Sequence, residues 1–348
     1  MVRHQDDAAA GKEPGLTYAA AGVDVVAGER AVTMMRAAVE ATHGPRVLDG
    51  LGGFAGLWSF DHGRWRDPVL ASAADGVGTK VLVAQALDRH DTVGLDLVAM
   101  VVDDLVVVGA EPLFLLDYLA VGRLDPERVA AVVAGVAEGC RLARCALLGG
   151  ETAEHPDALP PDAYDLAGFA VGVAERERLL GPDRVHAADV LLGLASTGLH
   201  ANGFSLARQA LARAGVGYEQ VVPELGGPVG EALLVPTRIY APDLVDLLAD
   251  GVEVHAMCHV TGGGLPGNLP RSLPPRLTAR VDQTSWEPPV VFRVVQELGG
   301  VADEEMARAT NLGVGMVLVL PPAAADRAAA FLAGRGIDAW VMGEVAPA

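Results

Sequence analysis

Cysteine is scarce in this chain of 348 residues. Only Cys140, Cys145 and Cys258 occur, and their odd number and irregular spacing exclude both a disulfide framework and a cysteine-based zinc site. Residues 1–15 are polar and lack the apolar core of a secretory signal. We therefore expect a protein of the reducing cytoplasm, with buried cysteines that act as small hydrophobic residues.

Positive charge and long apolar runs are also lacking. The formal net charge of −19 argues against nucleic acid or an anionic membrane as a partner. The most apolar stretch, residues 98–116, is interrupted by Asp103, Asp104, Glu111 and Pro112, which is incompatible with a membrane span. An acidic protein that binds phosphates needs metal ions or local backbone donors.

The length and apolar content predict two domains. With 348 residues, of which 51% are hydrophobic, the chain exceeds the usual size of a single core and has apolar surface to spare for an oligomer interface. Gly181-Pro182 marks the boundary. We predict an arm at residues 1–16, an N-terminal domain at 17–178 and a C-terminal α/β domain at 179–348.

Lysine is almost absent, and its position is informative. Lys12 and Lys80 are the only lysines among 26 basic residues. Lys80 ends Asp75-Gly-Val-Gly-Thr-Lys80, which follows an apolar run typical of a buried strand. Gly76 and Gly78 allow close approach of a ligand to the backbone, and a compact ammonium suits an anion. The alternative is a plain strand–turn–helix corner with an exposed lysine.

Acidic residues follow in an apolar helix that we expect over residues 94–109. Asp96 and Asp103 lie two turns apart on one face, with Asp104 beside them, and no lysine or arginine occurs from residue 94 to 111. Such carboxylates favour Mg²⁺, although a solvated acidic face is the alternative. A second predicted strand, residues 146–148, is followed by Gly149-Gly-Glu-Thr-Ala-Glu154. Glu151 and Thr152 in this segment are further candidates for the metal–nucleotide site.

Three glycine turns are candidate anion sites. They are residues 49–56 with Gly52 and Gly53, residues 197–205 with His200 and Asn202, and Thr261-Gly-Gly-Gly264 next to His259. A turn that opens a helix offers free N–H groups to a phosphate. A bend is an equal alternative for the first turn, and capping and packing for His200. Pro236-Thr-Arg-Ile-Tyr240 starts another predicted helix.

Taken together and in order, these motifs resemble phosphoribosylformylglycinamidine cyclo-ligase, the aminoimidazole ribonucleotide synthetase of purine biosynthesis. The segments that carry the resemblance are Tyr18-Ala-Ala-Ala-Gly-Val-Asp24, Gly50-Leu-Gly-Gly-Phe54, Asp75-Gly-Val-Gly-Thr-Lys80, His90-Asp-Thr-Val-Gly-Leu-Asp-Leu-Val-Ala-Met100, Gly109-Ala-Glu-Pro-Leu-Phe114, Gly149-Gly-Glu-Thr-Ala-Glu154, His200-Ala-Asn-Gly-Phe-Ser205, Pro236-Thr-Arg-Ile-Tyr240 and His259-Val-Thr-Gly-Gly-Gly264. The resemblance implies an α/β (α+β) protein of two domains, with a mixed N-terminal sheet that forms a homodimer interface.

The resemblance also implies the chemistry. ATP activates the formyl amide oxygen of formylglycinamidine ribonucleotide as an iminophosphate, a nitrogen closes the imidazole ring, and ADP and phosphate leave. Catalytic roles are implied for Lys80, Asp103, His200 and His259. ATP would be bound by Asp75, Gly76, Gly78, Thr79, Lys80, Glu151 and Thr152. The substrate would be bound by Gly52, Gly53, His200, Asn202, Thr261, Gly262 and Gly263. Mg²⁺ would be bound by Asp75, Asp96, Asp103, Asp104 and Glu151.

The chain departs from the family pattern at two places. Asp103-Asp104 stands where Asn-Asp is commoner, and Arg36 stands where some relatives carry lysine. Selenophosphate synthetase, thiamine-phosphate kinase and a hydrogenase-maturation dehydratase share the superfamily. The first is disfavoured because the glycine-rich N-terminal region holds no cysteine, and the last because the chain ends Ala-Pro-Ala. A regulatory subunit without catalysis is a further alternative, which would bind ATP without turnover.

Overall fold

The structure is a computed structural model that describes residue 17 and residues 21–348. The predicted arm at residues 1–16 and part of the motif that begins at Tyr18 lie outside the described residues. In the described part of the chain, no helix is both long and apolar enough to cross a membrane. All three cysteines are buried as free thiols.

The first half of the chain forms a four-stranded mixed sheet. Its elements are α1 (Val25–Glu40), β1 (Pro68–Gly76), α2 (Val81–Ala86), α3 (Val93–Val107), β2 (Glu111–Val121), α4 (Pro126–Ala143), β3 (Ala146–Glu154) and β4 (Tyr164–Glu175). The strand order is β1-β4-β2-β3, in which only the β2–β3 pair is parallel because α4 connects these two strands. The mixed N-terminal sheet is therefore confirmed.

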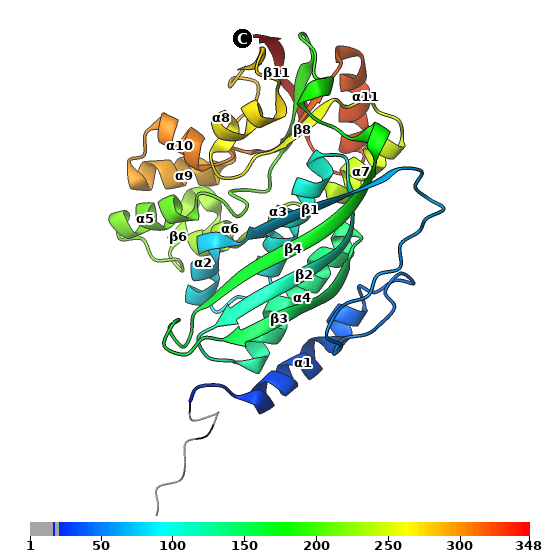
Figure 1. The fold of residues 1–348 in the computed structure, drawn as a ribbon. Helices are drawn as coiled ribbons and strands as arrows, with labels where there is room; N and C mark the ends of the chain where they lie inside the picture. Colours follow the sequence, from blue (N-terminus) through cyan, green and yellow to red (C-terminus); the bar gives the residue numbers. More distant parts are fainter. Residues whose placement is uncertain (1–16, 18–20) are drawn as a thin grey trace, which may run out of the picture.

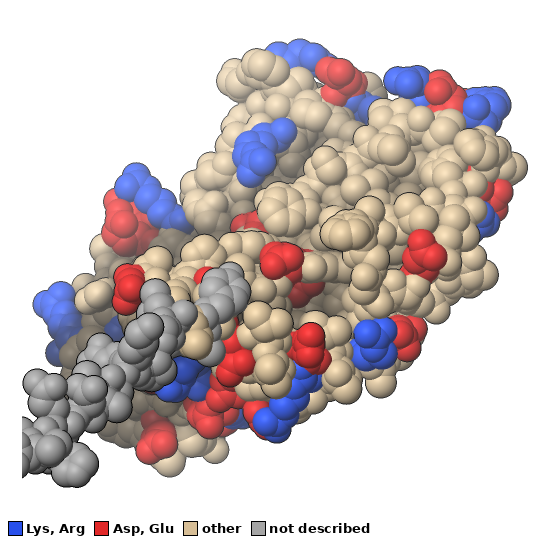
Figure 2. Space-filling view, turned by 60° about the horizontal axis from the view of Figure 1, so that its bottom comes forward, with Lys and Arg blue, Asp and Glu red and all other residues tan. Residues whose placement is uncertain are grey.

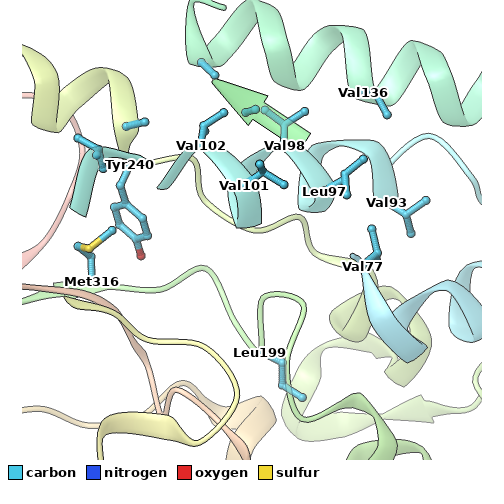
Figure 3. Close-up of a cluster of buried hydrophobic side chains, with 14 of the residues drawn as sticks. Val77, Val93, Leu97, Val98, Val101, Val102, Val136, Leu199, Tyr240 and Met316 are labelled. Carbon is cyan, nitrogen blue, oxygen red and sulfur yellow. The ribbon is translucent and has the colours of Figure 1, made fainter. Parts of the chain in front are cut away.

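Helices α3 and α4 cover one face of this sheet, and α1 packs against α4 (Figure 1). The two covering helices approach closely, since a Cβ atom at Gly94 would lie 2.1 Å from the backbone N of Val136. The valines and leucines of α3 form the core seen in Figure 3. The opposite face of the sheet is exposed and carries Leu70, Leu116 and Phe169.

The second half of the chain forms a five-stranded antiparallel sheet of order β8-β10-β5-β11-β9. Its strands are β5 (Val190–Ala195), β8 (Ala256–His259), β9 (Leu277–Val281), β10 (Val314–Leu320) and β11 (Ala339–Pro347). Its helices are α5 (Phe204–Ala214), α6 (Val229–Leu234), α7 (Ala241–Ala249), α8 (Gly264–Asn268), α9 (Val290–Gly299), α10 (Asp303–Ala309) and α11 (Pro322–Ala333). A short hairpin, β6 (Val221–Val222) with β7 (Gly227–Pro228), completes the domain. β10 lies between β8 and β5 and is buried along its whole length.

Helix α3 joins the two halves. It packs against β1 and β4 of its own sheet and also against α7 and β8 of the second half. Tyr240 and Met316 from the second half lie beside its core residues in Figure 3. The helix predicted to start at Pro236 begins only at Ala241, because residues 235–240 form a segment outside any helix or strand whose N–H groups bind the acids of α3. The predicted domain boundary at residue 178 stays a prediction.

Candidate active site

Asp75 lies near the end of β1, and the loop that follows this strand faces the second half of the chain. β1 ends at Gly76, and Gly78 takes a left-handed φ of 65°, which a side chain would oppose. The Asp75 side chain is exposed and accepts a hydrogen bond from the Gly76 N–H at 2.7 Å. Thr79 Oγ1 lies 3.1 Å from Ser205 Oγ at the start of α5. The loop thus reaches the His200–Ser205 turn.

Lys80 does not point into solvent or toward an open anion site. Its side chain is fully buried, and Nζ donates to Asp96 Oδ1 at 2.8 Å, to the His200 carbonyl at 2.9 Å and to the Val235 carbonyl at 2.7 Å. A lysine ammonium has three N–H donors, and all three are used here. The prediction that Lys80 meets a phosphate is therefore not supported by this arrangement.

Asp96 is the counter-ion of Lys80. Its Oδ1 also accepts hydrogen bonds from Thr237 N at 2.7 Å and Thr237 Oγ1 at 2.5 Å. Burial lowers the pKa of Lys80 and raises the pKa of Asp96, while the contact between the two charges opposes both shifts. We predicted that Mg²⁺ would balance this carboxylate. In the structure the cation next to Asp96 is a lysine outside the 94–111 window, so Mg²⁺ binding by Asp96 stays a prediction.

Asp103 is a buried acceptor for the start of α7. Its carboxylate accepts hydrogen bonds from Tyr240 N at 2.9 Å and Ala241 N at 2.7 Å, which are free N–H groups of the first helical turn. Burial raises the pKa of Asp103 to about 7. The predicted metal-binding and catalytic roles of Asp103 do not fit this position, since its oxygens face backbone donors in the domain junction.

Replacing Asp103 with alanine is expected to destabilise the fold by roughly 2–3 kcal/mol, because two buried N–H groups then lose a charged acceptor. The matched control is Asp104→Ala at the next position, where the carboxylate is 44% exposed and the loss should stay below about 1 kcal/mol. Urea unfolding of both variants measures the difference. Equal losses would contradict the assignment of Asp103 to the domain junction.

Asp104 instead contacts His259 at the end of β8. The distance from His259 Nδ1 to Asp104 Oδ1 is 2.9 Å, and His259 is buried. Burial opposes the charged imidazole, but the hydrogen bond to Asp104 and the nearby charges of Asp103 and Asp75 raise the His259 pKa above its ordinary value. Among the described residues, His259 Nε2 has no hydrogen-bond partner. The carboxylate therefore orients a ring whose second nitrogen is available for chemistry.

His200 is buried in an unusual backbone conformation. Its φ of 62° is left-handed, which few residues other than glycine adopt. Nε2 accepts a hydrogen bond from Thr197 N at 3.2 Å, so the neutral ring carries its proton on Nδ1, and that atom has no partner within the described part of the chain. Burial lowers the pKa of His200 well below its ordinary value. His200 is thus a neutral hydrogen-bond donor.

The predicted phosphate-binding turns meet in the same region. An added Cβ at Gly262 would lie 3.4 Å from Asn202 Oδ1, so the turn at 197–205 touches the turn at 261–264. Asn268, which sequence reasoning missed, donates from Nδ2 to the carbonyls of Gly262 at 3.1 Å and Gly264 at 2.9 Å. The sequence signal was an asparagine at the end of the glycine- and proline-rich α8, where its amide fixes the glycine loop.

The remaining predicted residues lie elsewhere. Gly52, Gly53, Glu151 and Thr152 line a cavity of about 1140 Å³ beside the exposed sheet face. In the strand register, Asp75 of β1 pairs with Gly168 of β4. Gly168 pairs with Asp117 of β2, which in turn pairs with Gly150 of β3. Three strand spacings separate Glu151 from Asp75 by roughly 14 Å. In residue 17 and residues 21–348, no three acidic, histidine or cysteine side chains gather as a metal site. The described residues of one chain therefore do not bring the five predicted acids together, and their metal-binding roles stay predictions.

The sequence matches two family models, described as the N-terminal and C-terminal domains of AIR synthase related protein, at residues 62–174 and 187–348. A phosphoribosylformylglycinamidine cyclo-ligase of Sorangium cellulosum is 54% identical over 332 residues, which cover 95% of each chain. One of an Anaeromyxobacter species is 52% identical over 331 residues, covering 95% of this chain and 96% of the relative. The chain belongs to this cyclo-ligase family. The recognition made from the motifs is therefore confirmed.

Solved structures agree on the fold. Thiamine-monophosphate kinase from Stenotrophomonas maltophilia aligns with a TM-score of 0.67 at 19% identity, covering 92% of this chain and 94% of that chain. The hydrogenase maturation protein HypE in complex with ATP aligns with a TM-score of 0.65 at 18% identity, covering 92% and 86%. At this identity the likeness concerns the fold alone. The cyclo-ligase shares that fold with enzymes of other names.

Proposed function

We propose that this cyclo-ligase closes the imidazole ring of aminoimidazole ribonucleotide from formylglycinamidine ribonucleotide, with hydrolysis of ATP to ADP and phosphate. The observation that carries the proposal is the convergence at the domain junction. The buried histidines His200 and His259 lie with the glycine turns and two exposed carboxylates, and each has a ring nitrogen without a partner among the described residues. The names of the relatives identify the reaction, and this junction contains the groups that it needs.

Mg²⁺-ATP would bind at the Asp75 loop. Mg²⁺ commonly uses one or two protein carboxylates together with substrate phosphates, so a full protein cage is not required. Asp75 and Asp104 fit that pattern, because both carboxylates reach solvent and lie near each other. Partial burial raises the pKa of Asp75, and the nearby charge of Asp104 raises it further. Gly76, Gly78 and Thr79 would contact the nucleotide through backbone and hydroxyl groups. The bound ion would neutralise phosphate charge.

The ribonucleotide would lie between the two halves of the chain. The turn at residues 261–264 and Asn202 would hold its phosphate and ribose through backbone and amide donors. The neutral Nδ1–H of His200 is suited to donate to a substrate oxygen. Gly52, Gly53, Glu151 and Thr152 line the separate cavity, so their implied roles in substrate, ATP and metal binding stay predictions.

The reaction has two chemical steps. The formyl amide oxygen attacks the γ-phosphorus of ATP, ADP leaves, and the amide nitrogen loses its proton as the C=N bond of the iminophosphate forms. The amidine-side nitrogen then attacks the same carbon, the C–O bond breaks, and phosphate leaves with the former amide oxygen. His259 would accept the proton that the attacking nitrogen loses, since Asp104 holds its Nδ1 and leaves Nε2 for the substrate.

The test is product formation by the purified protein. Aminoimidazole ribonucleotide should appear in equal amount to ADP when ATP, Mg²⁺ and formylglycinamidine ribonucleotide are all present, and chelation of Mg²⁺ should stop the reaction. The thiamine-monophosphate kinase fold relative suggests a competing reaction, phosphorylation of a small substrate. ATP consumption that yields a phosphorylated ribonucleotide without ring closure would overturn the proposal.

The exposed sheet face would form a homodimer. Leu70 is 63% exposed and Phe169 is 51% exposed on this face, next to Leu116 and Tyr118. Figure 2 shows the molecule from below, where much of the surface in view carries neither acidic nor basic side chains. An apolar area of this kind on a sheet face is typical of a permanent protein interface. The enzyme would act in the cytoplasm as a pair of identical subunits.

Phe169→Asp is expected to convert the dimer to monomers, because the new charge would be buried without a partner in the interface. Analytical ultracentrifugation at micromolar concentration measures the mass. The control is Val341→Asp, which adds the same charge at a 49% exposed valine on β11 and should leave the mass unchanged. A wild-type monomer, or an unaltered Phe169→Asp dimer, would contradict the proposed interface.

A further inference from the structure

Lys80 connects three parts of the junction through one buried atom. Its Nζ contacts Asp96 of α3, the carbonyl of His200 and the carbonyl of Val235, all within 2.9 Å. The Phe204 ring lies 5.4 Å from the same nitrogen. Asp96 in turn accepts hydrogen bonds from the N–H and hydroxyl of Thr237. Two segments of the second half, at residues 197–204 and 235–241, are thereby fixed to the first half.

The backbone of His200 needs such a fixed neighbour. A histidine with φ of 62° is strained, and strain of this kind persists only where surrounding contacts hold it. The Lys80 ammonium holds the carbonyl of that residue, while Thr197 N holds the ring through Nε2. Loss of the ammonium would free the carbonyl and allow the residue to relax to an ordinary conformation. The Nδ1 donor would then move away from its position at the junction.

The choice of lysine in an arginine-rich chain agrees with this role. The acceptors around Nζ are one carboxylate oxygen and two carbonyl oxygens in a fully buried space. A compact ammonium with three rotatable donors can serve three separate acceptors, whereas a planar guanidinium is suited to paired oxygens in one plane. A phosphate ligand would not require full burial or backbone acceptors.

From this geometry we infer that Lys80 is a positioning residue, which sets the conformation of His200 and the substrate turn and does not bind the phosphates of ATP. The inference rests on the proposed function for its catalytic consequence. Its structural content, the dependence of the 197–203 backbone on Lys80, is independent of the reaction.

The experiment uses the full chain and four proteins: wild type, Lys80→Met, Lys80→Met/Asp96→Asn and Arg293→Met. The double variant removes both buried charges at once, so that no unpaired ion remains to prevent folding. Arg293 is exposed on α9 and matches the loss of one positive charge. Calorimetry measures binding of a non-hydrolysable ATP analogue with Mg²⁺, steady-state kinetics measures kcat and KM for the ribonucleotide, and hydrogen exchange follows residues 196–203.

We expect the double variant to bind the analogue within about threefold of wild type, while kcat/KM for the ribonucleotide falls by on the order of 100-fold through misplacement of His200. Hydrogen exchange of residues 196–203 should accelerate, and Arg293→Met should match wild type in all three measurements. A tenfold or larger loss of analogue binding would make Lys80 a phosphate ligand and overturn the inference. Unchanged hydrogen exchange at residues 196–203 would also overturn it.

The two proposals fail in different ways. A wild-type protein without substrate-dependent turnover contradicts the proposed function, and hydrogen exchange of the variants still decides the role of Lys80. An active wild type with a double variant that is equally active contradicts the positioning role and leaves the proposed function intact.

Discussion

Lys80→Met is expected to lower the free energy of unfolding by roughly 3–5 kcal/mol, which is the usual loss when one partner of a buried ion pair is removed. Asp96 would then be left as a carboxylate without its cation, and the His200 and Val235 carbonyls would lose a donor. Chemical denaturation of wild type and variant measures the change. This is the largest stability effect that we expect from a single substitution.

A double-mutant cycle with Asp96→Asn supplies the control. Because the double variant contains neither charge, its unfolding free energy should lie closer to wild type than the sum of the two single losses predicts. The Thr237 hydrogen bonds can be retained by the asparagine oxygen. Additive losses, or a loss below about 1 kcal/mol for Lys80→Met, would show that the ion pair contributes little.

His259→Gln is expected to lower kcat by on the order of 10²–10⁴, because glutamine can fill part of the space but cannot exchange a proton. The His259 Nε2 has no hydrogen-bond partner in the part of the chain that the structure describes, and Asp104 Oδ1 orients the ring by its 2.9 Å contact with Nδ1. Single-turnover measurements of ring closure distinguish this chemical step from product release.

His255→Gln is the matched control for this substitution. His255 is buried directly before the same strand, and its Nδ1 lies 2.8 Å from the buried Asp189 carboxylate. Its Nε2 lies 3.2 Å from Glu253 Oε1, so it shares the histidine–aspartate contact of His259 but not the unpartnered nitrogen. Loss of a buried histidine–aspartate contact should therefore reduce stability in both variants. Only His259→Gln should show a large decrease in kcat. Equal decreases in kcat for the two variants would show that His259 has only a structural role.

Local patterns were enough to predict most elements of the N-terminal half. The helix expected over residues 94–109 forms over Val93–Val107. The apolar run before Asp75 forms β1, although this is an edge strand with no buried residue, and the strand expected at 146–148 continues to Glu154. Such elements depend on side-chain periodicity, which a sequence shows directly. The ordered motifs also identified the family, because several short matches in a fixed order are specific when each alone is not.

Contacts across long sequence distances could not be predicted in the same way. The acceptors of Lys80 at His200 and Val235 are 120 and 155 residues away, and Asp104 is 155 residues from His259. The sequence around α3 therefore shows no counter-ion for its carboxylates, because their partners lie far away in the chain. The separation of Glu151 from Asp75 follows from the strand order β1-β4-β2-β3, which places two similar strand ends on opposite edges of the sheet.

The most direct test of the account follows an oxygen atom. Formylglycinamidine ribonucleotide labelled with ¹⁸O at the formyl amide is incubated with the protein, Mg²⁺ and unlabelled ATP, and the released phosphate is analysed by mass spectrometry. If ATP activates that oxygen as an iminophosphate, each phosphate carries one labelled oxygen from the substrate. Release of unlabelled phosphate would contradict the account.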